Sequence, residues 1–122
     1  MPEGRRTRER RGRRAETLAA AFLLMKGYRI VARRYRTPSG EIDLVVRRGG
    51  TVAFVEVRGR ADRDTAAAAI AARQQRRITA AAAFFVSAHP WAAALVHRLN
   101  AALIVPGRWP RHVIDAWRES AS

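Results

Sequence analysis

The chain has 122 residues, no cysteine, a hydrophobic fraction of 48% and a net charge of +14 at neutral pH. This length suits a single domain with one modest core, and the absence of cysteine excludes disulfides and thiolate metal sites. No apolar run reaches the roughly eighteen residues of a membrane span, and the N-terminus lacks the pattern of a secretory signal, so we expect a cytoplasmic protein.

The positive charge is the strongest global signal, because it attracts polyanions and nucleic acid above all. The sequence contains no long basic amphipathic helix with a bulky apolar face, which is the pattern that would indicate binding to a membrane surface instead. Residues 1–14 contain seven arginines and almost nothing apolar. We expect them to form a basic, disordered arm that either contacts phosphates or only aids solubility, followed by one domain over residues 15–122.

Apolar residues at helical spacing predict a helix from about Ala15 to Lys26, with Gly27 as its C-cap. Glu16 falls in the first turn of this predicted helix. It is either an acid favoured by the helix dipole and neighbouring arginines, or a carboxylate aimed at a functional site. A strand rich in β-formers follows from Tyr28 to Tyr35, and the turn at residues 37–40 leads into a hairpin.

The hairpin consists of two strands, residues 40–48 and 51–58, joined by Gly49-Gly50. If Gly49-Gly50 forms a two-residue loop, Asp43 on the first strand lies directly opposite Glu56 on the second, and Glu41 lies opposite Arg58. Like charges in directly opposed positions are destabilising, so this arrangement indicates a cation between the two carboxylates. Both faces of the hairpin are substantially apolar, with Ile42 placed beside Leu44 on one of them, which predicts a sheet covered on both sides.

The second half of the chain predicts a helix from about Thr65 to Val86, a short helical segment at 92–96, a strand at 99–105 and an edge strand at 111–114. A polar band at Gln74, Gln75, Arg76 and Arg77 is interpreted as the solvated face of the long helix. The three histidines lack metal-binding spacing and are interpreted as loop or surface residues.

Asp43 on one strand, with Glu56 and Arg58 on the next, is the minimum set for a divalent-metal phosphodiesterase. Paired carboxylates bind Mg²⁺ or Mn²⁺, which activates water and polarises a phosphoryl oxygen, and a nearby cation stabilises the developing negative charge. The spacing alone is a weak signal. The net charge and the opposed acids strengthen it.

The segments Gly40-Glu41-Ile42-Asp43-Leu44 and Phe54-Val55-Glu56-Val57-Arg58 resemble the YraN-type family of small bacterial proteins. The QQRRI segment at residues 74–78 and the residues from Arg108 to Trp117 are similar to other parts of that family. The resemblance implies a restriction-endonuclease-like fold, close to that of archaeal Holliday-junction resolvases, with an αβββαβ core and a mixed sheet. It also implies metal ligands at Asp43 and Glu56, with Glu16 as a helix-borne acid.

Two positions depart from the family pattern. Arg58 replaces a lysine, and arginine cannot act as a base although it can stabilise a phosphoryl group. Asn100 stands where the family has an acid.

We therefore predict a nucleic-acid-binding protein that hydrolyses structured or branched DNA with Mg²⁺ or Mn²⁺, using Glu16, Asp43, Glu56 and Arg58. The alternatives are a DNA- or RNA-binding module that has lost catalysis, and a ribosome- or membrane-associated basic protein. A homodimer is compatible with either nucleic-acid function. The candidate nucleic-acid contacts are Arg13, Arg14, Arg34, Arg36, Arg60, Gln75 and Arg76.

Overall fold

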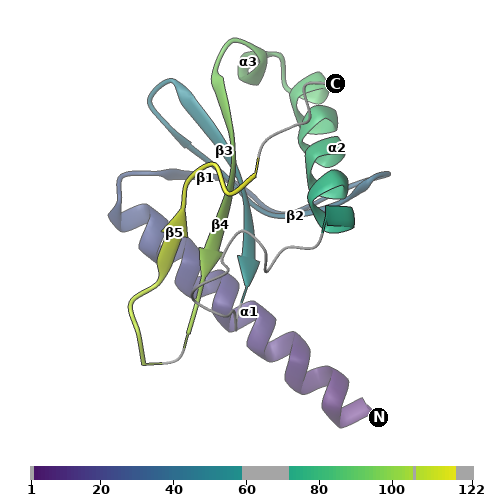
Figure 1. Ribbon diagram of the computed structural model, residues 1–122, viewed down its shortest axis with the longest axis vertical. Helices are drawn as coiled ribbons and strands as arrows, with labels where there is room; N and C mark the ends of the chain where they lie inside the picture. Colours follow the sequence, from purple (N-terminus) through teal and green to yellow (C-terminus); the bar gives the residue numbers. More distant parts are fainter. Residues whose placement is uncertain (1, 59–71, 106, 118–122) are drawn as a thin grey trace.

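The computed structural model describes residues 2–58, 72–105 and 107–117, with side chains from residue 13 onward. The elements in chain order are α1 (Pro2–Met25), β1 (Arg29–Thr37), β2 (Gly40–Arg48), β3 (Thr51–Arg58), α2 (Ala72–Ala88), α3 (Pro90–Ala93), β4 (Val96–Leu103) and β5 (Arg111–Val113) (Figure 1). The strands form one sheet in the order β1-β2-β3-β4-β5, in which only β3 and β4 run parallel. The predicted αβββαβ core with a mixed sheet is confirmed.

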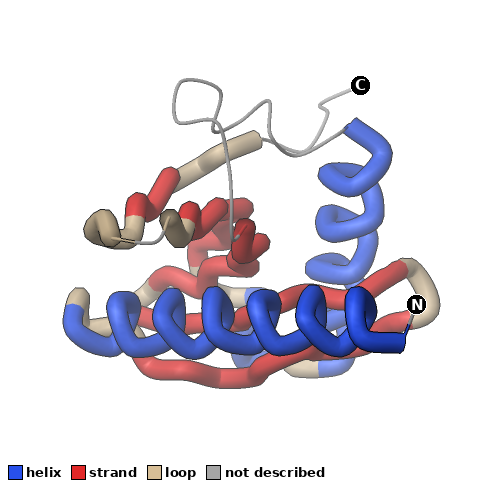
Figure 2. The backbone as a smooth tube through the Cα atoms, turned by 90° about the horizontal axis from the view of Figure 1, so that it is seen from below, coloured by secondary structure: helices blue, strands red, loops and turns tan. Residues whose placement is uncertain are grey.

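The two long helices lie on opposite faces of the sheet (Figures 1 and 2). On the α1 side, the core consists of Ala15, Ala19, Ala20 and Leu23 from the helix against Leu44, Val46, Ala53 and Val55 from the sheet. On the α2 side it consists of Ala81, Ala82 and Phe85 against Ile42, Val45, Val52 and Phe54. The hairpin strands β2 and β3 are therefore buried from both sides, as their apolar pattern predicts.

Helix α1 begins at Pro2, so the predicted start near Ala15 is wrong. The expected domain boundary after Arg14 falls inside this helix. Arginine and glutamate are good helix formers, and the segment contains many of them, so high charge does not prevent helix formation here. The C-terminal end is as predicted. Gly27 has a φ of +92°, and hydrogen bonds from Gly27 N to Leu24 O (3.0 Å) and from Tyr28 N to Leu23 O (3.0 Å) close a Schellman motif.

The predicted register of the hairpin is confirmed from Arg48↔Thr51 to Leu44↔Val55. Gly49, in the two-residue turn, has a φ of +58°. Beyond Leu44 the ladder stops, and Glu41 pairs with Arg36 on β1 rather than with Arg58 on β3. Ile42 packs in the cluster under α2, not beside Leu44 as a regular pleat would place it.

The remaining elements follow the prediction with shifted boundaries. The expected first turns of the long helix, at residues 65–71, lie outside the described residues, and the helix is seen from Ala72 to Ala88. The short helix α3 and strand β4 begin earlier than expected, at Pro90 and Val96. The C-terminal segment returns to α2, where Trp117 Nε1 donates to Thr79 Oγ1 at 3.1 Å. In the part of the chain that the structure describes, no helix is long and apolar enough to cross a membrane.

Candidate functional site

Asp43 and Glu56 meet at the open end of the hairpin, where β2 separates from β3. In the continued register Val57 would face Ile42. Instead the Val57 N–H donates to Asp43 Oδ2 at 2.8 Å, so a side chain replaces the backbone acceptor. This local break fixes the Asp43 carboxylate against β3, and it accompanies the displacement of Ile42 to the other face.

The Glu56 side chain is almost fully buried, with 4% of its surface exposed. Burial, followed by a hydrogen bond with Asp43 and its negative charge, raises the pKa of Glu56 from an ordinary 4.5 to about 8. A proton on Glu56 is therefore favoured at neutral pH far more than on an ordinary carboxyl group. Burial and the charge of Asp43 thus favour protonation of the pair when no cation is bound, and the cation expected between the two acids stays a prediction.

Two further side chains reach the second oxygen of Glu56. Arg58 Nη2 lies 3.1 Å from Glu56 Oε2, and Gln74 Nε2 on α2 donates to the same oxygen at 3.3 Å. Both contacts lower the pKa of Glu56 and so oppose the effect of burial. The Nε atom of Arg58 is buried and has no hydrogen-bond partner among the described residues. A buried donor of this kind favours an oxygen ligand that completes its hydrogen bonding.

Glu16 lies in the middle of α1, not in its first turn, so the dipole explanation for this residue is wrong. The explanation by neighbouring arginines is correct. Glu16 Oε1 accepts from Arg33 Nε at 3.0 Å, and Glu16 Oε2 accepts from Arg34 Nε at 2.7 Å. The bond to Glu16 also raises the pKa of Arg34 above its ordinary value. Glu16 thus fixes two guanidinium groups of β1.

Glu16 and Asp43 line a common pocket of about 350 Å³. Glu41 also contributes to its wall, and the arginines around it are Arg13, Arg34 and Arg36. Three acids and three arginines therefore line one pocket. Such a pocket is suited to a phosphate group together with a divalent cation, because the acids can hold the cation and the arginines can pair with the phosphate oxygens.

The donor set fits Mg²⁺ or Mn²⁺ only in part. No group of three or more His, Cys, Asp or Glu side chains that could hold a metal ion occurs among residues 13–58, 72–105 and 107–117. Both oxygens of Glu16 are already paired with arginines. Asp43 and Glu56 nevertheless offer two adjoining carboxyl groups, and Mg²⁺ is commonly held by one or two carboxylates, with water and substrate phosphates as the other ligands. Two acids are sufficient for that mode of binding.

The predicted nucleic-acid contacts occupy two places in the part of the chain that the structure describes. Arg13, Arg34 and Arg36 border the pocket, and Arg14 is exposed beside them on α1. Gln75 and Arg76 lie in the first turns of α2. This end of the helix is close to the β1–β2 turn, because a methyl group at Gly40 would lie only 3.5 Å from the Cβ of Arg77. Arg60 lies outside the described residues.

Sequence reasoning missed Gln74, which belongs to the polar band interpreted as a solvated helix face. It is half-buried and bonded to Glu56. The only available signal was its place in the QQRRI segment, because neither spacing nor charge distinguishes it from Gln75.

A second polar network, outside the pocket, involves the buried Asn100. Its Nδ2 lies 2.9 Å from His112 Nε2, and His112 Nδ1 lies 2.7 Å from Lys26 Nζ. His112 is thus a half-buried strand residue, whereas the sequence predicted a loop or surface position. Its burial, followed by the charges of Lys26 and Arg48, lowers its pKa from 6.5 to about 4.

Comparison with known proteins places these residues in a family. Residues 15–104 match Uncharacterised protein family UPF0102. A UPF0102 protein of Parvibaculum lavamentivorans is 58% identical over 109 residues, which cover 89% of this chain and 82% of the relative. One from Methylobacterium nodulans is 50% identical over 118 residues, covering 95% of this chain and 92% of the relative. The matched region contains Glu16, Asp43, Glu56 and Gln74.

Proposed function

The chain belongs to the UPF0102 family, as its resemblance to the YraN-type proteins predicted, and from this premise we propose that it binds nucleic acid and hydrolyses phosphodiester bonds in structured or branched DNA with Mg²⁺ or Mn²⁺. The observation that carries the proposal is the contact between Asp43 and Glu56 beside a pocket lined by arginines. The net charge of +14 supports a polyanionic substrate. We place the protein in the cytoplasm, where such a substrate is found.

In this proposal Asp43 and Glu56 hold the ion. When bound there, it polarises a phosphoryl oxygen and activates a water molecule. Arg58 contacts the scissile phosphate through the donors that Glu56 leaves free, and its buried Nε, which has no hydrogen-bond partner among the described residues, supports this role. Glu16 holds Arg34 at the pocket, where Arg34 and Arg36 pair with neighbouring phosphates.

The second candidate is a nucleic-acid-binding module without catalysis, and a specific observation favours it. Arg58 occupies the position of the lysine in the related motif, and arginine cannot accept a proton from water. This candidate keeps the arginines around the pocket as phosphate contacts. It predicts strongly salt-dependent binding that is insensitive to substitution of either acid.

A cleavage assay with matched acid variants tests the proposal. The wild-type chain is incubated with branched, flap and single-stranded DNA in Mg²⁺ or Mn²⁺, beside Asp43→Asn and Glu56→Gln. Calorimetric titration with Mn²⁺ on the same proteins supplies a readout that does not depend on activity. Cleavage and Mn²⁺ binding that both disappear in the variants support the enzyme.

Two outcomes decide against hydrolysis. Cleavage that persists in Asp43→Asn points to a contaminating nuclease. The absence of both cleavage and Mn²⁺ binding, with DNA binding equal in the wild type and in both variants, establishes the non-catalytic module instead.

A further inference from the structure

From Ile78 onward, helices α2 and α3 contribute no charged residue to their outward face, and the guanidinium of Arg47 on β2 reaches it at the Trp91 ring, 5.2 Å from the ring centroid. Across residues 78–96 there is no arginine, lysine, aspartate or glutamate, although 28% of the whole chain is charged. The exposed residues in this range without such a contact, which we call the uncharged face, are Ala80, Ala83, Phe84, Ser87, Ala88, Pro90, Ala93, Ala94 and Val96. The feature is independent of the acid pocket and of the function proposed for it.

Helix α2 has two apolar stripes. One stripe packs on the sheet and consists of the buried Ile78, Ala81, Ala82 and Phe85. The opposite stripe, with the same helical spacing, consists of the exposed Ala80, Ala83, Phe84, Ser87 and Ala88. A surface helix normally carries charged residues on its outward side, whereas a helix that is apolar all round is typically buried. The outward stripe of α2 is therefore suited to contact with another protein surface.

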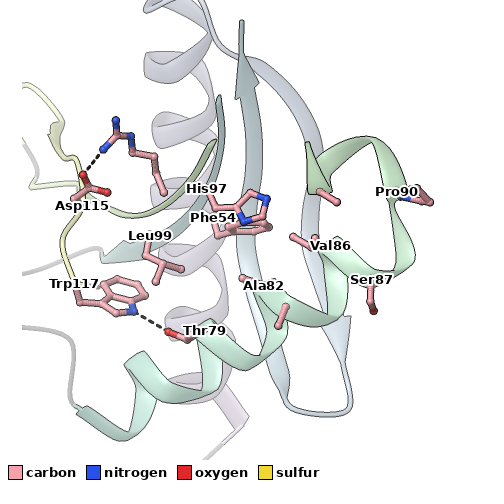
Figure 3. A pocket seen from close by; sticks show the side chains of 13 residues that line it. Phe54, Thr79, Ala82, Val86, Ser87, Pro90, His97, Leu99, Asp115 and Trp117 are labelled. Carbon is pink, nitrogen blue, oxygen red and sulfur yellow. Dashed lines mark hydrogen bonds and ion pairs between the residues drawn. The ribbon is translucent and has the colours of Figure 1, made fainter. Parts of the chain in front are cut away.

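A groove of about 750 Å³ continues this face toward the C-terminal segment (Figure 3). Val86 and Ala82 of α2 form one wall, and Leu99 and Trp117 lie opposite (Figure 3). Ala83 also lines the groove. Arg98 and Asp115, which both line the groove, form an ion pair. Their charges cancel, so the groove has little net charge. Because Ala83 belongs to both, the groove and the outward stripe form one continuous surface.

We propose that this surface is the interface of a homodimer, in which α2 packs against α2 of a second copy about a twofold axis. Two chains of charge +14 repel each other wherever their arginines meet, and the uncharged face is the part of the described surface where they can approach. An acidic partner would instead bind the arginine-rich parts of the surface, because they attract negative charge. The electrostatics thus favour a second copy over a polyanion or an acidic protein.

The shape of the surface supports the same occupant. A twofold interface must be complementary to itself. This one offers the ring of Phe84, which is 41% exposed, directly after Ala83 in the groove lining, and the groove can receive such a ring from a second copy. Ala80, Ala83 and Ser87 are small enough to allow two helix axes to come close.

The size of the surface is also adequate. A stable interface buries about 800 Å² on each partner and uses roughly twenty or more residues a side. That area is about a tenth of the 8062 Å² of accessible surface on this chain. The uncharged face and the groove walls together approach the required number of residues.

Sedimentation equilibrium of the full chain, stripped of nucleic acid, tests the proposal. The matched variants are Ala83→Arg, which places a charge in the outward stripe, and Ala21→Arg, which places the same charge at an exposed position on α1. We expect dimers for the wild type and for Ala21→Arg, and a dissociation constant at least about a hundredfold higher for Ala83→Arg. The wild-type dimer should tighten as salt rises to about 0.5 M, because salt screens the repulsion.

Three outcomes overturn the proposal: a wild-type monomer at about 100 µM protein, an unchanged dissociation constant in Ala83→Arg, or a dimer that dissociates as salt rises. The last result would indicate bridging by nucleic acid. If Ala83→Arg does not fold, single cysteines at positions 80, 83 and 87, introduced one at a time into this cysteine-free chain, replace it. At least one should form a disulfide-linked dimer under mild oxidation, and Ala21→Cys should not. Failure of all three contradicts the interface.

Discussion

The backbone N–H of Val57 donates to the carboxylate of Asp43 at 2.8 Å, in place of a ladder bond to a carbonyl of β2. One acid therefore has two separable properties. Its oxygen satisfies a backbone donor, and its charge acts on Glu56. A substitution that keeps the oxygen but removes the charge will differ from one that removes both.

Asp43→Asn and Asp43→Ala separate these two properties. The asparagine keeps an acceptor for Val57 and removes a negative charge beside Glu56, so we expect wild-type or greater stability. The alanine leaves a backbone donor unsatisfied, which costs about 1–3 kcal/mol. Urea unfolding at pH 7 measures both. Equal losses in the two variants would mean that the charge, and not the hydrogen bond, stabilises the fold.

Stability should fall as pH rises from about 5 to 8, because of Glu56. The pKa of Glu56 is about 8 in the folded state against an ordinary 4.5, so the folded chain binds its proton more tightly. The stabilisation is complete below 4.5 and is lost as pH rises through 8. The full shift from 4.5 to about 8 corresponds to roughly 5 kcal/mol, since one pKa unit corresponds to about 1.4 kcal/mol. Measuring the free energy of unfolding between pH 6.5 and 8 separates the Glu56 contribution from that of His112. Glu56→Gln should abolish the dependence of this free energy on pH. A slope that persists in this variant would assign the effect to another group.

The opposite dependence is expected at acid pH, because of His112. Its pKa of about 4 lies below the ordinary 6.5, so the folded state resists protonation of the ring. This contribution is complete above 6.5 and is lost as pH falls through 4. The ring is only half-buried, so solvent screening limits the effect to about 1–2 kcal/mol. His112→Gln should flatten the stability curve in this range relative to the wild type, and NMR titration of the imidazole supplies the pKa directly. A normal imidazole pKa would refute the assignment.

Arg36 should contribute to nucleic-acid binding through phosphate contact. It is 86% exposed in its side chain and borders the acid pocket. Arg36→Ala should weaken DNA binding and reduce the slope of log K against log salt by about one unit. Arg108→Ala removes the same charge from an exposed position outside the pocket lining and is the matched control. Equal effects of the two substitutions would show that binding follows net charge and not the pocket.

Much of this fold could be predicted from local pattern. The two-residue Gly49-Gly50 turn determined the hairpin register, and the apolar alternation on both faces indicated two covering layers. The start of α1 could not be predicted, because a charged segment that forms a helix and one that stays unstructured have similar composition. Ile42 was misplaced because the break at Asp43 depends on a side-chain hydrogen bond that periodicity does not reveal.

The candidate site was predictable where its members share a hairpin and unpredictable where they do not. Asp43, Glu56 and Arg58 follow from register. The bonds from Gln74 to Glu56 and from Arg34 to Glu16 join elements that are distant in the chain, and only the packing of both helices brings them together. The raised pKa of Glu56 was not predicted because the burial that causes it is a property of the whole fold.

The parallel pairing of β3 with β4 also bears on the order in which the chain folds. The β2–β3 hairpin closes through two residues, whereas Thr51 meets Val96 only after the crossover that contains α2. Long closures cost more chain entropy and tend to form late. In refolding experiments we therefore expect Leu44→Ala to slow folding, and Leu99→Ala mainly to speed unfolding. The acids would then meet early on the pathway, and Gln74 would join them only near its end.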